Sequence, residues 1–127
     1  MDYSIKIQIN DSLENTKDKL LSKLKEKWFW LVTELDLSKI FKNKLWEKIG
    51  EYHILWVCNP WYSYKLYKID PMMGWILPCK VVLFTKEDKN FIWLVKPTIQ
   101  NNFLENDVFK NVIEEVEEIL IEIIKTI

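Results

Sequence analysis

Two short motifs occupy the centre of the sequence: Cys58-Asn59-Pro60, which closes an apolar run, and residues 74–79, which read Gly-Trp-Ile-Leu-Pro-Cys. The stretch 52–97 around them holds both cysteines, all four prolines and one of the two glycines. Asparagine accepts hydrogen bonds from the free N–H groups at a helix start, and proline fits the first helical position. The proline of the second motif cannot donate to a β ladder, which confines it to a strand start or a bulge. The motifs therefore predict a strand, a helix, a turn and a second strand, in that order.

The composition is that of a folded domain with little charge bias. A chain of 127 residues is expected to form one domain, 1–127, which can bury a core without disulfides or metals. The net charge is −1 and the sequence contains no arginine, whose guanidinium contacts phosphates in pairs, so we expect no nucleic-acid partner. Seven tryptophans indicate that several are buried or that one apolar face is a contact surface.

The N-terminal residues lack the basic and apolar segments of a signal peptide. No apolar run approaches the length that spans a bilayer. We therefore expect a cytoplasmic protein with no membrane partner, in which the two cysteines are reduced thiols.

Hydrophobic periodicity predicts five strands and four helices. Asp11 followed by Glu14 predicts a capping box at the first helix. Gly50 predicts the end of the second helix, and Gly74 a turn with a positive φ angle. The expected strands are 3–9, 29–35, 52–58, 80–85 and 91–96, and the expected helices are 13–28, 37–49, 61–69 and 107–127.

This order of elements favours an α+β fold with two layers. We expect a five-stranded, largely antiparallel sheet with two long amphipathic helices packed on one face. The last two strands, joined across 87–90, are expected to form a hairpin. The strand 52–58 has apolar side chains on both faces, with Trp56 on one and Leu55 on the other. Such a strand is covered on both sides or is paired within a dimer.

The two motifs resemble those of domain-of-unknown-function family 302, a group of small bacterial and archaeal proteins. The resemblance implies a two-layer α+β fold like that of the TATA-binding-protein half-domain, often in dimers, and no established reaction. The family usually carries glycine where Trp28 stands, and a small residue soon after Cys-Asn-Pro, where this chain has the bulky Trp61. The residues that carry the resemblance, within about 20–97, are Cys58-Asn59-Pro60, Asp70-Pro71, Gly74 and Leu77-Pro78-Cys79.

The two cysteines lie at ends of predicted strands, beside turns. We favour the interpretation that both are small buried side chains that fill space. The alternative is thiol chemistry, with Cys58 as a thiolate favoured by the following helix and Cys79 as its resolving partner. We expect no metal and no cofactor, since only His53 could add a third ligand and it points to the opposite face from Cys58. The candidate site is the corner formed by Cys58, Asn59, Pro60, Gly74, Pro78 and Cys79.

His53 is the only histidine, and the sequence places no orienting carboxylate or nucleophile beside it. We therefore predict no catalytic residue and favour a role without enzymatic activity, with thiol chemistry as the enzymatic alternative. The aromatic residues around the motifs favour core and dimer interface, although they could also stack a planar ligand or single-stranded bases. The possible stacking residues are Trp56, Trp61 and Trp75.

These observations favour a self-associating binding or accessory module of otherwise uncharacterised function. It is expected to be a homodimer. A small-molecule ligand is compatible with the sequence, which does not identify its chemical class. Two alternatives stay open. One is a thiol or redox protein that uses Cys58 and Cys79, and the other is a single-stranded nucleic-acid binder that uses the aromatic residues and the lysines of the first helix.

Overall fold

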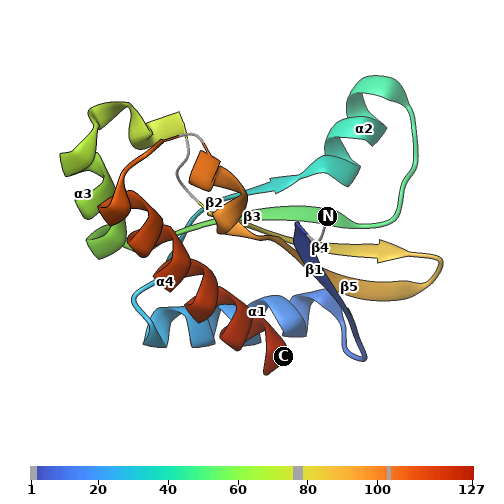
Figure 1. The fold of residues 1–127 in the computed structure, drawn as a ribbon. Helices are drawn as coiled ribbons and strands as arrows, with labels where there is room; N and C mark the ends of the chain where they lie inside the picture. Colours follow the sequence, from blue (N-terminus) through green and yellow to red (C-terminus); the bar gives the residue numbers. More distant parts are fainter. Residues whose placement is uncertain (1–2, 76–78, 103) are drawn as a thin grey trace.

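The computed structural model describes residues 3–75, 79–102 and 104–127. Five strands form one antiparallel sheet in the order β1-β5-β4-β3-β2, and the long helices α1 and α4 lie together on one face (Figure 1). The predicted α+β class is confirmed. The strands are β1 (Ser4–Ile9), β2 (Trp30–Asp36), β3 (Tyr52–Cys58), β4 (Cys79–Lys86) and β5 (Lys89–Val95); the helices are α1 (Leu13–Glu26), α2 (Leu37–Leu45), α3 (Pro60–Ile69) and α4 (Asp107–Lys125), with 3-10 helices η1 (Pro71–Trp75) and η2 (Pro97–Asn102).

The core lies between the sheet and the two long helices. Alternate residues of each central strand point towards the helices, as the period of two requires. The α4 stripe that packs on them includes Phe109, which is fully buried. The strand residues that face the helices with at most 1 % exposure are Leu55, Val57, Val81, Leu83, Ile92 and Leu94.

The first helix begins one residue later than the predicted capping box requires, so that prediction is wrong. Ser12 is the N-cap, and its Oγ accepts from the backbone N–H of Asn15 at 3.0 Å. Asp11 lies outside the helix, where its Oδ1 accepts from the Ser12 N–H at 2.7 Å. A serine directly before the first helical residue occupies the capping position itself, which leaves the aspartate to order the preceding turn.

The end of α1 is a complete Schellman motif. The N–H of Phe29 donates to the Leu24 carbonyl at 3.0 Å, and the N–H of Trp28 donates to the Lys25 carbonyl at 3.1 Å. The motif requires a left-handed residue, which is Trp28 with a φ of 66°. Phe29 and Leu24 are both buried, which supplies the apolar contact of the motif. The chain thus closes this helix with the same backbone geometry that glycine would favour.

Replacing Trp28 by glycine is expected to raise the free energy of unfolding by about 1 kcal/mol, because a left-handed conformation is unfavourable for any side chain with a Cβ. The indole is 70 % exposed, so little packing is lost. Trp30→Gly, placed in β2, should have the opposite sign because glycine weakens a strand. Urea unfolding of both variants measures this, and a Trp28→Gly protein less stable than wild type would contradict it.

Two of the predicted glycine roles are wrong. Helix α2 ends at Leu45 and is closed by Trp46, which has a φ of 59°. Gly50 lies five residues beyond the end of the helix, in exposed chain. Gly74 lies within η1, and no glycine among the described residues has a positive φ. The left-handed pair Glu87 and Asp88 instead forms the two-residue turn of the β4–β5 hairpin, whose mirror-image geometry suits the strand twist.

Candidate functional site

Asn59 holds the predicted corner together. Its Oδ1 accepts from the backbone N–H groups of Trp61 at 3.0 Å and Tyr62 at 3.4 Å, which confirms the predicted start of α3. Its Nδ2 donates to the carbonyl of Lys27 at 3.1 Å, so the same side chain joins the start of α3 to the end of α1. At 5 % exposure Asn59 is one of the few buried polar residues, and each half of its amide has a partner.

Both cysteines are free and line one small cavity beside Asn59. The cavity has a volume of about 20 Å³, which is room for a single water molecule. The Cys58 sulfur lies 2.7 Å from the Ser63 hydroxyl. Burial, and to a lesser degree the neighbouring Cys58, raise the pKa of Cys79 to about 12. Cys79 is therefore a protonated thiol at neutral pH.

The structure brings some of the predicted site residues together and separates others. Pro60 is the exposed first residue of α3. Trp56 lies on the sheet face away from α1 and α4, where its buried Nε1 has no hydrogen-bond partner in the described part of the chain. Trp61 is 65 % exposed on α3. Pro78 and the Trp75 side chain lie outside the described residues, and of Gly74 only the backbone is described.

The buried Cys79 thiol should make the protein less stable at alkaline pH. The ordinary pKa of a thiol is 9.0, so the unfolded chain loses this proton well before the folded chain does. The contribution of Cys79 to the free energy of unfolding is complete below pH 9 and falls by about 1.4 kcal/mol per pH unit up to about pH 12. Urea unfolding at pH 8 and 10.5 should show a smaller fall for Cys79→Ala than for wild type, with Cys58→Ala as the matched control. Equal falls in all three proteins would contradict the prediction.

The structure assembles a second cluster of polar side chains that the sequence did not predict. Both ring nitrogens of His53 face carboxylates, with Nδ1 3.5 Å from Glu34 Oε1 and Nε2 3.5 Å from Glu51 Oε1. Asp36 lies 3.9 Å from Nδ1, and Lys17 pairs with Glu34. The sequence shows that Glu34 and Asp36 are two residues apart, but only the β2–β3 register shows that both lie beside His53.

The histidine cluster borders a hollow of about 240 Å³ whose lining holds three glutamates against one lysine. Such a lining favours cations over anions. Within the described ranges, however, no three His, Cys, Asp or Glu side chains group closely enough to hold a metal ion. The cluster thus ties α1 to β2 through the Lys17–Glu34 ion pair, and β2 to β3 through the contacts of His53.

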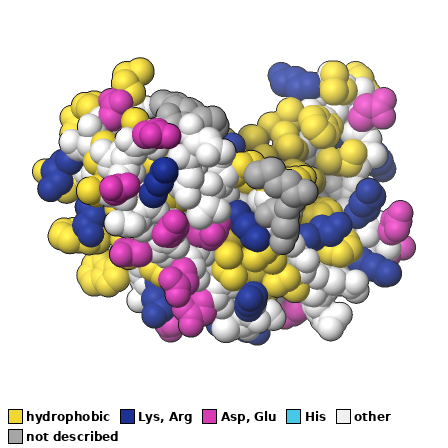
Figure 2. Space-filling view, in the orientation of Figure 1, with side chains coloured by type: hydrophobic (Ala, Val, Ile, Leu, Met, Phe, Trp, Pro, Cys, Tyr) yellow, Lys and Arg dark blue, Asp and Glu magenta, His cyan; other side chains and the backbone are white. Residues whose placement is uncertain are grey.

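The face of the sheet opposite α1 and α4 is a second candidate surface. An aromatic row crosses three strands: the Phe84 ring lies 5.7 Å from Tyr52, 5.2 Å from Phe91 and 6.4 Å from Trp93, centroid to centroid. These rings are half-buried, and a groove of about 610 Å³ runs over them. Figure 2 shows hydrophobic side chains gathered over the adjoining α2 part of the molecule. This open face is an apolar surface of the domain that α1 and α4 do not cover.

The architecture defines a small two-layer α+β domain whose sheet is covered by long helices on one face only. The family model described as "Domain of unknown function DUF302" matches residues 5–127, and the chain belongs to this family. The predicted resemblance is therefore confirmed. The crystal structure of the uncharacterized conserved protein DUF302 from Bacillus stearothermophilus superposes with a TM-score of 0.90 over 98 % of each chain at 20 % identity, so the two share the fold.

A comparison with curated proteins gives no match. Among the described residues, no helix has the length and apolar character needed to cross a membrane. The family and the fold thus leave the function to be argued from the surfaces of the domain.

Proposed function

We propose that the domain is a self-associating binding module in which two copies pair through α2 and the open face of the sheet. The observation that carries the proposal is that α2, an amphipathic helix, has no buried residue. Leu45 is 63 % exposed and Trp46, which ends the helix, is 90 % exposed. The apolar face of a helix is normally covered by other elements, so its exposure here favours a partner.

The neighbouring sheet face supports a second copy as that partner. Tyr52 and Trp93 keep part of their rings accessible although they lie at the centre of the sheet. In a two-fold pair the same patch is used twice, so α2 of one copy can lie over the aromatic row of the other. The net charge of −1 opposes such pairing only weakly. A stable pair needs about 800 Å² buried on each copy, which two helical turns and three strands can provide.

Size-exclusion chromatography with light scattering, at about 100 μM protein, tests the proposal. Wild type is expected to have the mass of a dimer, and Leu45→Glu that of a monomer, because the change places a charge in the proposed interface. Leu45 is exposed, so the variant should fold. Trp61→Glu introduces the same charge at an exposed residue of α3 and should stay dimeric. A monomeric wild type, or a dimeric Leu45→Glu protein, would reject the proposal.

We further propose that the module works in the cytoplasm, where thiols such as these two free cysteines stay reduced. We also propose that the sheet, with its order β1-β5-β4-β3-β2, has the arrangement of the TATA-binding-protein half-domain, as the resemblance implies. It carries no DNA-binding role with it, because function depends on the site.

Thiol chemistry at the predicted corner is the second candidate function. What favours it is that Cys58 and Cys79 line one cavity, so a two-electron oxidant could join them with loss of two protons. The raised pKa of Cys79 opposes it, because the attacking species is a thiolate. Native protein treated with oxidised glutathione at pH 8 tests it by mass spectrometry. An unchanged mass leaves the corner as a structural joint, whereas loss of two hydrogens supports the thiol role.

A further inference from the structure

We propose that one end of the molecule, away from α2, binds single-stranded nucleic acid through exposed aromatic rings that each lie beside a lysine. An accessible ring can stack a nucleobase, and an adjacent ammonium group can contact the phosphate of the same nucleotide. Three such pairs define what we call the ring–lysine surface: Lys25 with Trp30, Lys65 with Trp61 and Lys68 with Tyr64, with Nζ 5.5, 5.2 and 5.1 Å from the ring centroids.

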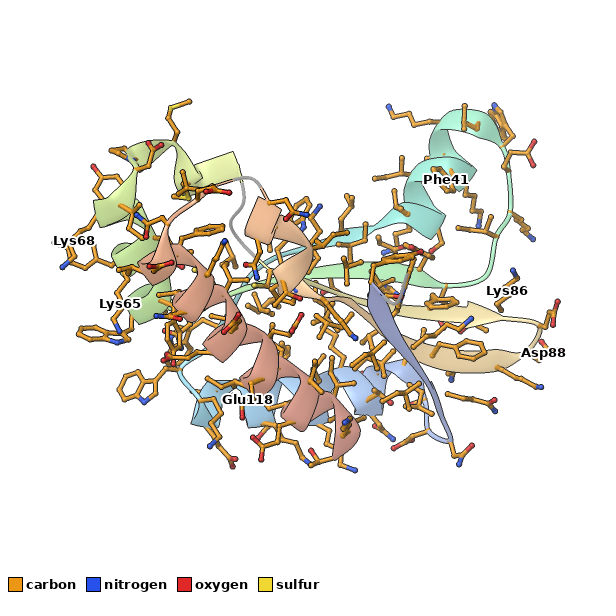
Figure 3. The ribbon with its side chains drawn as sticks, viewed as in Figure 1. Phe41, Lys65, Lys68, Lys86, Asp88 and Glu118 are labelled. Atoms are coloured by element: carbon orange, nitrogen blue, oxygen red, sulfur yellow. The ribbon has the colours of Figure 1, made fainter. Side chains whose placement is uncertain are left out.

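The three pairs are brought together by the corner described above. The Asn59 amide bonds to the Lys27 carbonyl, which places the end of α1 beside the start of α3. Trp30 is the register partner of Cys58, directly before Asn59. Along α3 the remaining residues of the surface follow the spacing i, i+3, i+4 and i+7, which puts them on one face of the helix. Figure 3 shows Lys65 and Lys68 on the outer side of α3.

Trp28 provides an independent observation at the same place. Its left-handed conformation would be more stable with glycine, and its ring is 70 % exposed, so the indole contributes little to the core. Unfavourable backbone conformations are enriched at functional sites. Trp28 directly follows Lys27, the residue bonded to Asn59, and so adds a further accessible ring to the surface.

The surface fits a narrow flexible strand better than a broad anionic partner. A hollow of about 420 Å³ beside α3 is lined by Lys65 and Lys68 but also by Glu115 of α4. Figure 3 shows Glu118 on α4, apart from Lys65 and Lys68 on α3. The glutamates of α4 would repel a duplex or an anionic bilayer that extended across both helices. A single strand can follow α3 alone and stack about four bases on four rings.

The composition argued against nucleic acid because arginine is absent, but it could not show that lysines and rings are paired at one end. Three lysines predict a moderate affinity with a logarithmic salt slope of about −2, since each phosphate contact on a single strand contributes about −0.7. Binding should therefore weaken about 20-fold between 50 and 200 mM salt.

Fluorescence anisotropy with a labelled dT12 strand and the full chain tests the inference. Wild type is expected to bind at 50 mM salt and to lose affinity about 20-fold at 200 mM. Trp61→Ala should weaken binding about 10-fold through lost stacking, and Lys65→Gln should reduce the salt slope by about 0.7. Trp46→Ala removes an even more exposed tryptophan, at the end of α2, and should leave the affinity unchanged.

Several outcomes would overturn the inference. These are no binding to dT12 at 50 mM salt, equal binding to a 12-base-pair duplex, or equal loss in Trp46→Ala and Trp61→Ala. Binding to phosphatidylserine vesicles without binding to dT12 would assign the surface to a membrane instead. The inference does not rest on self-association: Leu45→Glu is expected to keep dT12 binding even as a monomer, so the two proposals can fail separately.

Discussion

Gly50→Ala is expected to lower the free energy of unfolding by about 2–3 kcal/mol, because the added methyl group has no space. A Cβ at this position would lie 2.3 Å from the backbone oxygen of Thr85, well inside van der Waals contact. The carbonyl cannot easily move away, since the N–H of Thr85 donates to the Glu51 carbonyl at 2.8 Å. The close approach of the two segments, and not a positive φ, explains glycine at this position.

Urea unfolding at one fixed protein concentration measures the effect of Gly50→Ala, because stability depends on concentration in a self-associating protein. Lys48→Ala is the matched control in the same exposed segment and should change stability by less than about 0.5 kcal/mol. If Gly50→Ala were as stable as its control, the segment before β3 would have to shift freely from β4, and the close approach would not be a constraint.

Asn59→Ala is the second change with a large expected effect, about 2–3 kcal/mol of destabilisation. It removes the N-cap of α3, worth about 1 kcal/mol, and it leaves the Lys27 carbonyl without its donor in a part-buried place. Because Asn59 joins the end of α1 to the start of α3, the loss should also loosen the start of α3. Amide hydrogen exchange should therefore speed up in the first turn of α3 more than in α4.

Asn59→Asp separates the two roles of this side chain. Its carboxylate still accepts from the Trp61 and Tyr62 N–H groups, and a negative charge is favourable at a helix start. It cannot donate to Lys27, so its stability should fall between wild type and Asn59→Ala. An aspartate variant as unstable as the alanine variant would mean that the bond to Lys27, and not the cap, carries the effect.

Local sequence signals predicted most of the elements and the start of α3. The Asn59-Pro60 pair specifies a helix start by itself, because capping needs only groups within three residues. The same reasoning failed for Asp11 and Gly50. Ser12, and not Asp11, caps α1, which begins at Leu13, and Trp46 ends α2 although glycine is the usual terminator. Each error concerns a helix boundary, which sequence signals place only to within a few residues.

The predicted corner was seen only in part from the sequence. That Cys58 and Asn59 lie beside a helix start follows from their order in the chain. Cys79 shares their cavity because the register of the adjacent strands β3 and β4 sets it opposite Val57. The contacts of His53 likewise depend on which strand lies next to β3, and alternation along one strand contains no such information.

The sequence by itself determined the α+β class, the capping of α3 and the family, because these depend on periodicity and on motifs of a few adjacent residues. Only the tertiary structure decided which surfaces remain uncovered. The helices α1 and α4 both pack on one sheet face, which leaves α2 without a buried residue and the aromatic row half-buried. The lysines and rings at the other end meet through the Asn59–Lys27 bond, between residues 32 positions apart. Such juxtapositions arise from packing of whole elements, and a linear pattern does not contain them.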